Sequence, residues 1–324
     1  MTTIKDVAES AGISIKTVSR VINGAPTVRP KVRAKVEAAM AALNYRPALA
    51  ARQLASGRSF IVALIAPRAT YSYFSRMMVA MAEACRSVGH HLVLEVIDAQ
   101  EVEAPDWHLR LSCDPDAVLV IPPYADHPRM VAALATLGKP LVRVAGAQDG
   151  MGQSLPVEDA AIAGEMARYL LGKGHRRLAI IAPPRDTMPA WSRVTGFAAA
   201  LAEAGVDLPE AYMLRGDMRF SSGDAALRQL MALPQRPSAI FACNDPMALG
   251  AMSAALRLGF AVPQDVAIAG FDHSSEGQMG FPTLTTIHQP VEDIARRAVG
   301  MALGRAEMVE QAGELPYLVP RESA

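Results

Sequence analysis

Apolar residues at the start of the chain recur every three or four positions, which is the spacing of amphipathic helices. The pattern is interrupted at Gly12-Ile13-Ser14, where Ser14 is well placed to cap the helix that follows, and Asn23-Gly24 is a typical helix stop. A third helix is expected after Pro30 and ends before Arg46-Pro47. The positions expected to face inward are Val7, Ala8, Ala11, Val18, Val21, Ile22, Val32, Val36, Met40 and Leu43. The pattern therefore predicts an all-α head, residues 1–47, followed by a short helix at 48–55 and a flexible junction at Ser56-Gly57.

After residue 58 the pattern changes to short apolar runs that alternate with alanine-rich helical stretches. Such alternation predicts right-handed βαβ units in doubly wound parallel sheets. Seven runs resemble buried strands, at 60–67, 91–97, 117–123, 140–146, 177–184, 238–244 and 265–271. Helical stretches between them include 75–88, 158–172, 194–204 and 246–258. Seven strands exceed what one such sheet usually holds, so we expect two similar lobes with a ligand cleft at the carboxyl ends of their strands.

Charge is distributed unevenly along the chain, although the 324 residues have a formal net charge of zero. Residues 1–58 hold ten Lys and Arg against three Asp and Glu, whereas the remainder holds 22 against 29. A basic segment followed by an acidic body indicates that contact with nucleic acid is confined to one end of the chain.

Composition excludes several other classes of protein. The three cysteines, Cys85, Cys113 and Cys243, are widely spaced and form no CxxC pair, which predicts a reducing compartment and neither disulfides nor a thiolate metal site. No stretch approaches the ~20 apolar residues of a membrane helix, and the first residues do not have the pattern of a signal peptide. We therefore expect a cytoplasmic protein with no membrane contact and no cofactor.

The head has the pattern of a helix-turn-helix, in which the second helix presents its opening residues to base edges in the major groove. Ile15, Lys16 and Arg20 fall on the outward side of this helix. Lys and Arg can donate to guanine O6 and N7, and an isoleucine can contact a thymine methyl, so these three are the candidate base-reading residues. Candidates for contact with the DNA backbone are Ser14, Thr17, Ser19, Arg29 and Tyr45. The alternative reading is a small solvated helical bundle, because generic matches to this pattern include false positives.

The runs IKDVAESAGISIKTVSRVING (4–24) and VRAKVEAAMAALNYRP (32–47) resemble the DNA-binding segment of the lactose-repressor/galactose-repressor (LacI/GalR) family. The resemblance implies that residues 48–58 form a hinge helix and linker, in which Leu54 is inserted into the minor groove of operator DNA. The family usually has Asn after its Tyr-x-Pro, whereas this chain has Ala48, so the start of the hinge departs from the pattern.

The resemblance continues through residues 59–324, in runs such as LLGKGHRRLAII (170–181) and RPSAIFACNDPMALGAM (236–252). It implies a two-lobed core, similar to periplasmic sugar-binding proteins, that binds a small-molecule effector. The expected first lobe covers about 59–172 and 289–305, and the second about 173–287 and 312–324. The family positions of effector-binding residues fall on Tyr73, Phe74, Arg193, Asn244 and Asp272. The chain stops soon after LPYLVPRES without leucine heptads, so a homodimer is expected.

Several positions of the presumed cleft leave alternatives open. Asp245 precedes Pro246 and is expected to cap the following helix rather than to bind ligand. Arg68 stands where the family commonly has Asp, Met218 where an aromatic residue is usual, and His273 where a second Asp is frequent. An added Arg and His, with acids lost, suggest an anionic or acidic sugar.

The interpretation is therefore a sequence-specific DNA-binding regulator that is controlled allosterically by a sugar or a sugar derivative. A repressor is expected, and an activator is the alternative, because the sign of regulation depends on where the operator lies relative to the promoter. Two alternatives are a sugar-binding protein with an accessory head and a sugar-processing enzyme. Neither a Ser-His-Asp order nor a G-x-S-x-G elbow is found, so we do not expect an enzyme.

Overall fold

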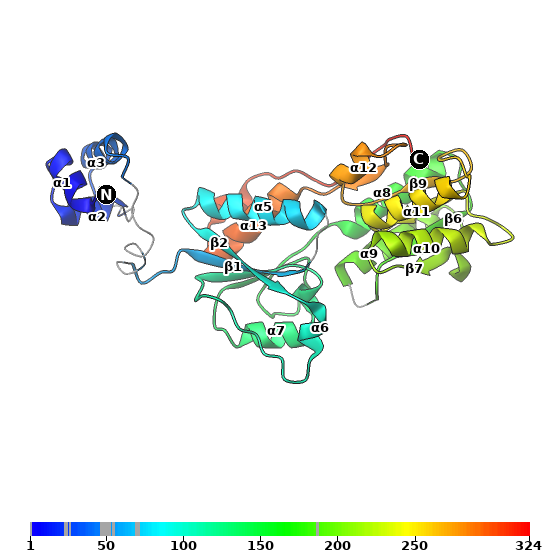
Figure 1. Cartoon of the computed structure of the whole chain (residues 1–324), viewed down its shortest axis with the longest axis horizontal. Helices are drawn as coiled ribbons and strands as arrows, with labels where there is room; N and C mark the ends of the chain where they lie inside the picture. The colour runs from blue at the N-terminus through cyan, green and yellow to red at the C-terminus, as the bar shows by residue number, and fades with distance from the viewer. Residues whose placement is uncertain are drawn as a thin grey trace. The chain divides into compact units, whose positions relative to one another are not determined.

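The computed structural model describes residues 2–22, 25, 27–45, 53, 56–68, 72–185 and 188–324. The chain divides into two compact units, Met1–Phe60 with Asp114–Asp116, and Ile61–Cys113 with Ala117–Ala324 (Figure 1). Each unit has its own hydrophobic core. In the described ranges, no helix combines the length and the apolar character needed to cross a bilayer.

The head contains the three expected helices, α1 (Ile4–Ala11), α2 (Ile15–Ile22) and α3 (Pro30–Ala42). Thr3 and Asp6 form a capping box at the start of α1, and Gly12 ends it in the left-handed conformation that glycine adopts most readily. The Ser14 hydroxyl accepts the N–H of Thr17 at 3.3 Å, which confirms its predicted role as the cap of α2. The predicted stop at Asn23-Gly24 lies outside the described residues.

The small core of the head follows the predicted helical spacing. Val7, Val18 and Val36, one from each helix, are completely buried and lie in one apolar cluster. Ala8, Ala11, Val21 and Ala39 complete its buried part, and the predicted inward residues Ile22, Met40 and Leu43 pack against it from partly buried positions. The apolar face therefore fixes which side of α2 is turned to solvent.

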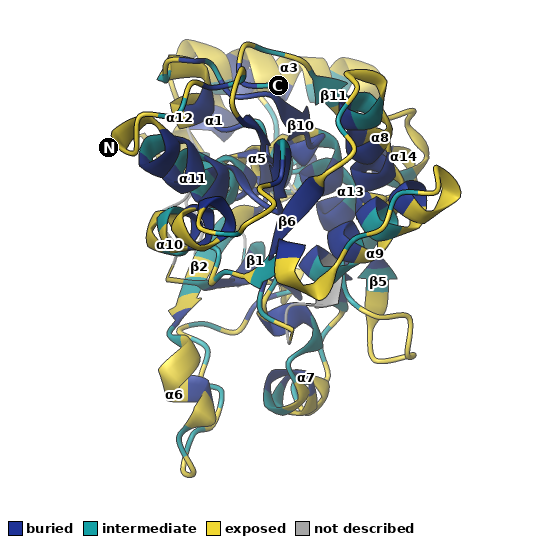
Figure 2. Cartoon of the chain, turned by 90° about the vertical axis from the view of Figure 1, so that its right-hand side faces the viewer, coloured by how far each residue is buried: buried dark blue, intermediate teal, exposed yellow. Residues whose placement is uncertain are grey.

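The first lobe of the second unit is built on a five-stranded parallel sheet of strand order β2-β1-β3-β4-β5. Along β1, Val62, Leu64 and Ala66 pack toward α5 and α13, whereas Ala63 and Ile65 pack toward α6 and α7. Both faces of this strand are therefore buried, as expected for parallel sheets (Figure 2). The strands are β1 (Ile61–Pro67), β2 (His91–Ile97), β3 (Ala117–Val120), β4 (Leu141–Val144) and β5 (Gln153–Leu155). The helices are α5 (Ser72–Ser87), α6 (Ala99–Glu103), η1 (Tyr124–Asp126), α7 (Pro128–Ala135), α13 (Val291–Leu303) and α14 (Ala306–Glu310).

The second lobe repeats this architecture around a four-stranded parallel sheet of strand order β7-β6-β8-β9. Phe197, Phe241 and Phe271 are completely buried in its single large apolar cluster. The strands are β6 (Leu178–Ala182), β7 (Met213–Arg215), β8 (Ala239–Ala242) and β9 (Ala267–Ala269). The helices are α8 (Asp159–Gly172), α9 (Met188–Glu203), η2 (Glu210–Tyr212), α10 (Phe220–Met231), α11 (Asp245–Arg257) and α12 (Ser275–Met279).

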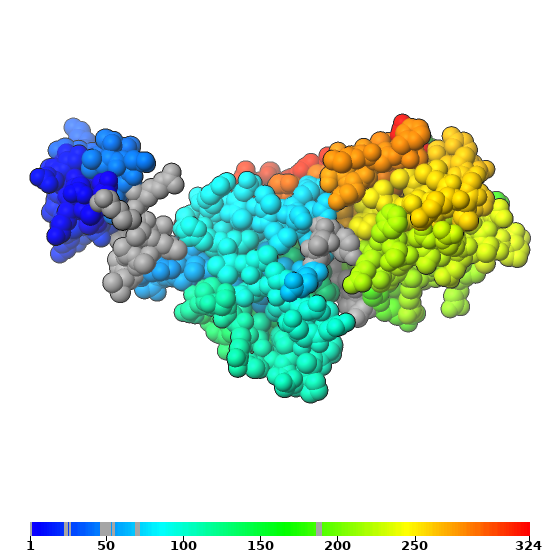
Figure 3. Space-filling model, viewed as in Figure 1, coloured from blue at the N-terminus to red at the C-terminus, as the bar shows by residue number. Residues whose placement is uncertain are grey.

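Two short antiparallel strands, β10 (Thr286–His288) and β11 (Tyr317–Val319), pair where the chain passes between the lobes. Figure 3 shows orange and red atoms of the last segments along both lobes. The fold class inferred from the sequence is confirmed: an all-α head and a two-lobed α/β core with parallel sheets.

The boundary between the lobes differs from the expected one at residues 172 and 173. Helix α8 contributes Ile162, Met166 and Leu170 to the core of the second lobe, where it packs against α9. The chain therefore crosses before α8, and the first lobe ends earlier than the expected residue 172. The reason is that α8 buries its apolar face against α9, a pairing that helical periodicity alone does not reveal.

Candidate functional site

Helix α2 presents a polar face to solvent opposite its buried face. Val18 and Val21 are buried, while Lys16 and Arg20 are exposed. Ile15, at the start of the same helix, is 44% exposed. The structure thus places the three candidate base-reading residues together on the solvent side of the helix.

The candidate residues for contact with the DNA backbone differ in their exposure and in their contacts within the head. The hydroxyls of Ser14 and Thr17 lie 2.9 Å apart at the start of α2, and Ser19 is partly buried. Arg29 is exposed directly before α3, whereas Tyr45 packs its ring against the apolar cluster of the head. Only the hydroxyl end of Tyr45 is therefore suited to contact a phosphate. Leu54 lies outside the described residues.

A cavity of about 400 Å³ lies where the strands of both lobes end. Its lining includes the last residue of β1, Pro67, and residues that come after other strands: Asp98 after β2, Ala145 after β4, Asn244 after β8 and Asp272 after β9. This is the place where open parallel sheets collect ligands, and its size suits a small molecule. All five predicted effector contacts line the cavity: Tyr73, Phe74, Arg193, Asn244 and Asp272.

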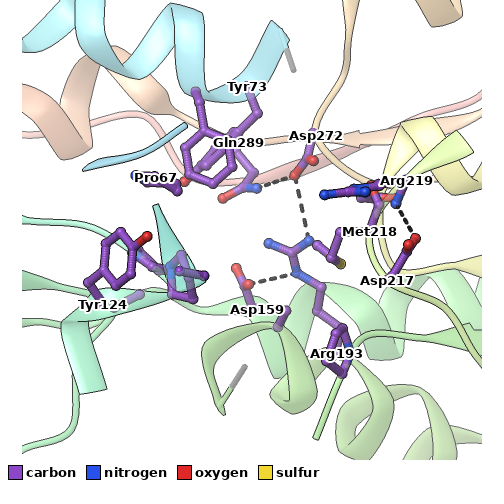
Figure 4. A pocket seen from close by; sticks show the side chains of 18 of the residues that line it. Pro67, Tyr73, Tyr124, Asp159, Arg193, Asp217, Met218, Arg219, Asp272 and Gln289 are labelled. Carbon is purple, nitrogen blue, oxygen red and sulfur yellow. Dashed lines mark hydrogen bonds and ion pairs between the residues drawn. The ribbon is translucent and has the colours of Figure 1, made fainter. Parts of the chain in front are cut away.

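Arg193 forms the floor of the cavity from α9 and is buried between two carboxylates (Figure 4). Its Nε donates to Asp159 Oδ2 at 2.8 Å, and its Nη1 donates to the Cys243 carbonyl at 2.6 Å and lies 3.6 Å from Asp272 Oδ1. Its guanidinium also lies 3.7 Å from the ring centroid of Phe271. Burial lowers the pKa of Arg193, but the two carboxylates outweigh burial and raise that pKa above its ordinary value. The guanidinium is therefore fixed in place and permanently charged.

Asp272 lies opposite Arg193 in a strained position. Its φ of 109° is rare for a residue other than glycine, and its Oδ1 accepts from Gln289 Nε2 at 2.6 Å. Burial raises the pKa of Asp272 to about 7, although the Arg193 charge acts to lower it. Strain of this kind is common at ligand-binding sites, where the fold holds a side chain in a set direction.

The cap of α11, expected to be Asp245, is Asn244 in the structure. Asn244 caps α11, because its Oδ1 accepts the N–H of Met247 at 3.0 Å, and its Nδ2 donates to the Met218 carbonyl at 2.9 Å. Asp245 is completely buried and accepts from the Ser274 N–H at 2.6 Å. The prediction that Asp245 is the cap was wrong, and Asn244 uses one donor and one acceptor within the protein.

Tyr73 and Phe74 stand at the start of α5, with their rings edge to face and their centroids 5.5 Å apart. Both line the cavity, and burial raises the pKa of the Tyr73 hydroxyl, so that it stays protonated. Two adjacent aromatic rings at a cavity wall can stack on the apolar face of a sugar or on a planar ring.

Sequence comparison identifies the two parts of the chain. Residues 3–48 match the family described as bacterial regulatory proteins, lacI family, and residues 167–324 match a periplasmic binding protein-like domain. The ribose operon repressor of Escherichia coli K12 is 33% identical over 330 residues, which cover 100% of both chains. The chain belongs to the LacI family. The PurR repressor of Escherichia coli O139:H28 is also 33% identical, over 94% of this chain and 90% of its own length.

Solved structures agree with this membership of the LacI family. A lac repressor dimer bound to operator and the anti-inducer ONPF superposes with a TM-score of 0.75, at 27% identity over 99% of this chain and 98% of that one. The regulator CelR in complex with cellobiose superposes with a TM-score of 0.67, at 27% identity over the full length of both chains. The chain is therefore a DNA-binding transcriptional regulator with an effector-binding core, and its relatives are repressors rather than enzymes.

Some residues of this LacI-family cavity were not anticipated. Asp159 and Gln289 hold Arg193 and Asp272 in place, and Arg219 lines the cavity after β7. A signal existed for two of them: Asp159 lies at the start of the helix predicted at 158–172, and Gln289 directly precedes Pro290. Neither signal says which arginine or aspartate lies within hydrogen-bond distance.

His273 was expected in the cleft, but it does not line the cavity. Its Nδ1 lies 2.9 Å from Nδ1 of His288 on β10, so the ring turns toward the paired strands. Burial and the nearby charge of Arg321 lower the pKa of His273 to about 4. Of the departures from the family pattern, the structure leaves Arg68 and Met218 at the cavity.

Proposed function

We propose that this protein is a homodimeric repressor that binds operator DNA through residues 1–47, joined by a hinge at 48–58 to an effector-binding core at 59–324. The observation that carries the proposal is the floor of the cavity, where Arg193 is buried between Asp159 and Asp272. A fixed guanidinium beside carboxylates offers donors and acceptors at the spacing of neighbouring hydroxyl groups. This arrangement supports a sugar or a sugar derivative as the effector.

The proposed DNA contacts follow from the exposed face of α2. Lys16 and Arg20 donate to guanine edges, and Ile15 contacts a thymine methyl. Contacts to the DNA backbone come from Ser14, Thr17, Ser19, Arg29 and Tyr45, which set the register of the helix on the duplex. Leu54 is proposed, from the family resemblance, to enter the minor groove.

The proposed effector contacts are Tyr73, Phe74, Arg193, Asn244 and Asp272. Nη2 of Arg193 has no hydrogen-bond partner among the described residues, so it is available to a ligand oxygen. The names of two similar proteins, the ribose operon repressor and a CelR–cellobiose complex, support a carbohydrate as the effector. Asn244 is the weakest of the five contacts, because its amide already caps α11 and holds the Met218 carbonyl.

A second copy of the chain is the proposed partner of two exposed apolar patches. Leu94 and Val96 are 41% and 40% exposed on β2, an edge strand whose free side can pair or pack with another chain. Met279 and Phe281, in the second lobe, are each 83% exposed. The related lac repressor forms a dimer. Sedimentation should give a dimer for the full chain, and Leu94→Arg with Phe281→Ser should give monomer; a wild-type monomer at micromolar concentration would contradict the proposal.

Operator binding tests the proposed roles in the head. A duplex selected from genomic fragments by gel shift should bind with a preference over a scrambled duplex. Lys16→Ala and Arg20→Ala should each reduce that preference by about 1–3 kcal/mol, because each removes one base contact. Arg86→Ala is the control, because it removes an exposed charge from the effector-binding unit outside the head, and it should leave the preference unchanged. An unchanged preference in both head variants would refute the assignment.

Control by the effector requires that the effector and the operator alter each other's affinity equally. Coupling between two sites is typically about 1–3 kcal/mol and is reciprocal. Titration of ribose, glucose and cellobiose, with and without operator, should identify a compound whose affinity changes by the same factor as operator affinity. A compound that binds the core with no change in operator affinity would contradict allosteric control.

A further inference from the structure

The carboxylates that line the cavity already accept hydrogen bonds from the protein. Asp98 accepts from the Gln100 N–H at 3.0 Å, and Asp217 accepts from the Arg219 N–H at 3.0 Å. Asp159 and Asp272 accept from Arg193 and Gln289 in the floor. A ligand therefore meets acceptors that are partly occupied.

Not every arginine that lines the cavity has a hydrogen-bond acceptor in the described part of the protein. Arg193 lies between two carboxylates, but the guanidinium groups of Arg68 and Arg219 have no acceptor within hydrogen-bond or ion-pair distance among the described residues. Burial acts to raise the pKa of Asp217, but hydrogen bonds with Ser222 and with the Arg219 N–H, together with the Arg219 charge, lower it, and no ion pair joins the two side chains. Each guanidinium carries five N–H donors in a planar fork.

These two arginines come from different lobes and line the same cavity. Arg68 directly follows β1 of the first lobe, and Arg219 lies between β7 and α10 of the second. Figure 4 shows the side chain of Arg219 extending toward Asp272 and Gln289 on the cavity wall. A group bound by both would contact both lobes at once.

The sum of formal charges does not decide the charge of the ligand, because three arginines and four aspartates line the cavity. The charge of the ligand depends instead on which charged groups of the cavity lack a hydrogen-bond or ion-pair partner. Burial raises the pKa of Asp272 to about 7, so one of the four aspartates is partly neutral at physiological pH. Among the described charged groups of the cavity, those without a partner are guanidinium donors, and planar guanidinium forks pair best with carboxylate or phosphate oxygens.

We infer that the effector carries an oxyanion, as a sugar acid or a sugar phosphate does, and that Arg68 and Arg219 bind this group while Arg193 and Asp272 bind hydroxyls. The inference rests on the proposed function, because it assumes a hydroxylated small molecule in the same cavity. It adds the chemical class of that molecule and two specificity-determining residues.

Binding of matched neutral and anionic compounds to the full-length protein tests this inference. The compounds are glucose with gluconate, glucuronate and glucose 6-phosphate, ribose with ribose 5-phosphate, and inorganic phosphate alone. Calorimetry at pH 7.5 should show at least one sugar anion that binds about 10-fold or more tightly than its neutral parent, the gain expected from a charge-assisted hydrogen bond. The gluconate and phosphate arms show whether the oxyanion is a carboxylate or a phosphate.

Arg68→Gln and Arg219→Gln should each weaken that anion by about 10-fold. The affinity of each variant for the neutral parent should stay within about 2-fold of the wild-type affinity. Such a change is smaller than the loss of one charge-assisted hydrogen bond would cause. Arg215→Gln is the matched control: Arg215 is exposed at the end of β7, four residues from Arg219, and does not line the cavity. This control should not change either affinity.

Three results would overturn the inference. The first is that no anion binds more tightly than its neutral parent, and the absence of binding by every compound tested counts as this result. The second is that both variants leave the ratio of affinities unchanged, and the third is that inorganic phosphate alone binds as tightly as the sugar phosphate. A neutral sugar that binds and changes operator affinity would refute this inference while the proposed function stands.

Discussion

Replacing Arg193 with methionine removes the only positive charge that lies between Asp159 and Asp272 in the described cavity floor. All three side chains are buried, with exposed fractions of 7%, 4% and 7% in that order. Methionine fills a similar volume but leaves two buried carboxylates without a counter-charge. Breaking a buried ion pair from one side typically costs about 3–5 kcal/mol, so Arg193→Met should lower the free energy of unfolding by that amount near pH 8.

The loss in Arg193→Met should depend on pH, and its sign follows from the carboxyl groups. Burial raises the pKa of Asp272 to about 7 even though Arg193 lowers it, so removing Arg193 raises this pKa further. The folded variant then binds a proton that the unfolded chain, with a pKa near 3.8, releases. Protonation removes the uncompensated charge, and stability is lost as pH rises through the folded pKa. The destabilisation should therefore be smaller at pH 5 than at pH 8.

Urea unfolding at pH 5 and pH 8, followed by circular dichroism, measures both effects. Arg228→Met is the control, because Arg228 pairs with Asp224 at the surface and is 47% exposed, so its loss should cost less than about 1 kcal/mol. Adding Asp159→Asn to Arg193→Met should restore part of the stability, since one buried charge is removed. A loss below about 1 kcal/mol at pH 8, or an equal loss at both pH values, would refute the account of the cavity floor.

Three further predictions concern the core. Asn244→Ala should lower stability by about 1–2 kcal/mol in thermal unfolding, because it removes a helix cap, whereas Asn244→Asp keeps an acceptor at the helix start and should lose less; equal losses would show that the cap is unimportant. Between pH 4 and pH 8, wild type should lose stability relative to Asp272→Asn as pH rises, because a carboxyl with a raised pKa stabilises the fold only while it is protonated. A free energy of unfolding that rises with pH in wild type relative to Asp272→Asn would contradict this prediction. Gly196→Ala should destabilise the core by about 1–3 kcal/mol or more, because a Cβ there would lie 1.9 Å from the Ala160 carbonyl, whereas Gly172→Ala, with open space around it, should stay within about 1 kcal/mol of wild type; equal melting temperatures would exclude close α8–α9 packing.

The order of elements was predictable because it depends on local periodicity. All seven predicted strands exist, and the helical spacing of Val7, Val18 and Val36 placed the core of the head correctly. The strands that were missed, β5, β7, β10 and β11, have three residues each and, unlike the equally short β9, do not lie in a longer apolar run. The lobe boundary was wrong because α8 joins the second lobe through its contact with α9, which depends on a partner thirty residues away.

The candidate site shows the same division between local and distant information. Arg193 and Asp272 could be named from the family resemblance, but the partners that give them their properties lie far along the chain. Asp159 is 34 residues from Arg193, and Gln289 is 17 residues from Asp272. The error over which residue caps α11 has the same cause: either Asn244 or Asp245 can cap a helix, and the distant Ser274 N–H and Thr286 hydroxyl bind Asp245 instead. Residue types at strand ends therefore predict where a ligand binds, whereas the charge state and the free donors of the site depend on pairings that only the fold creates.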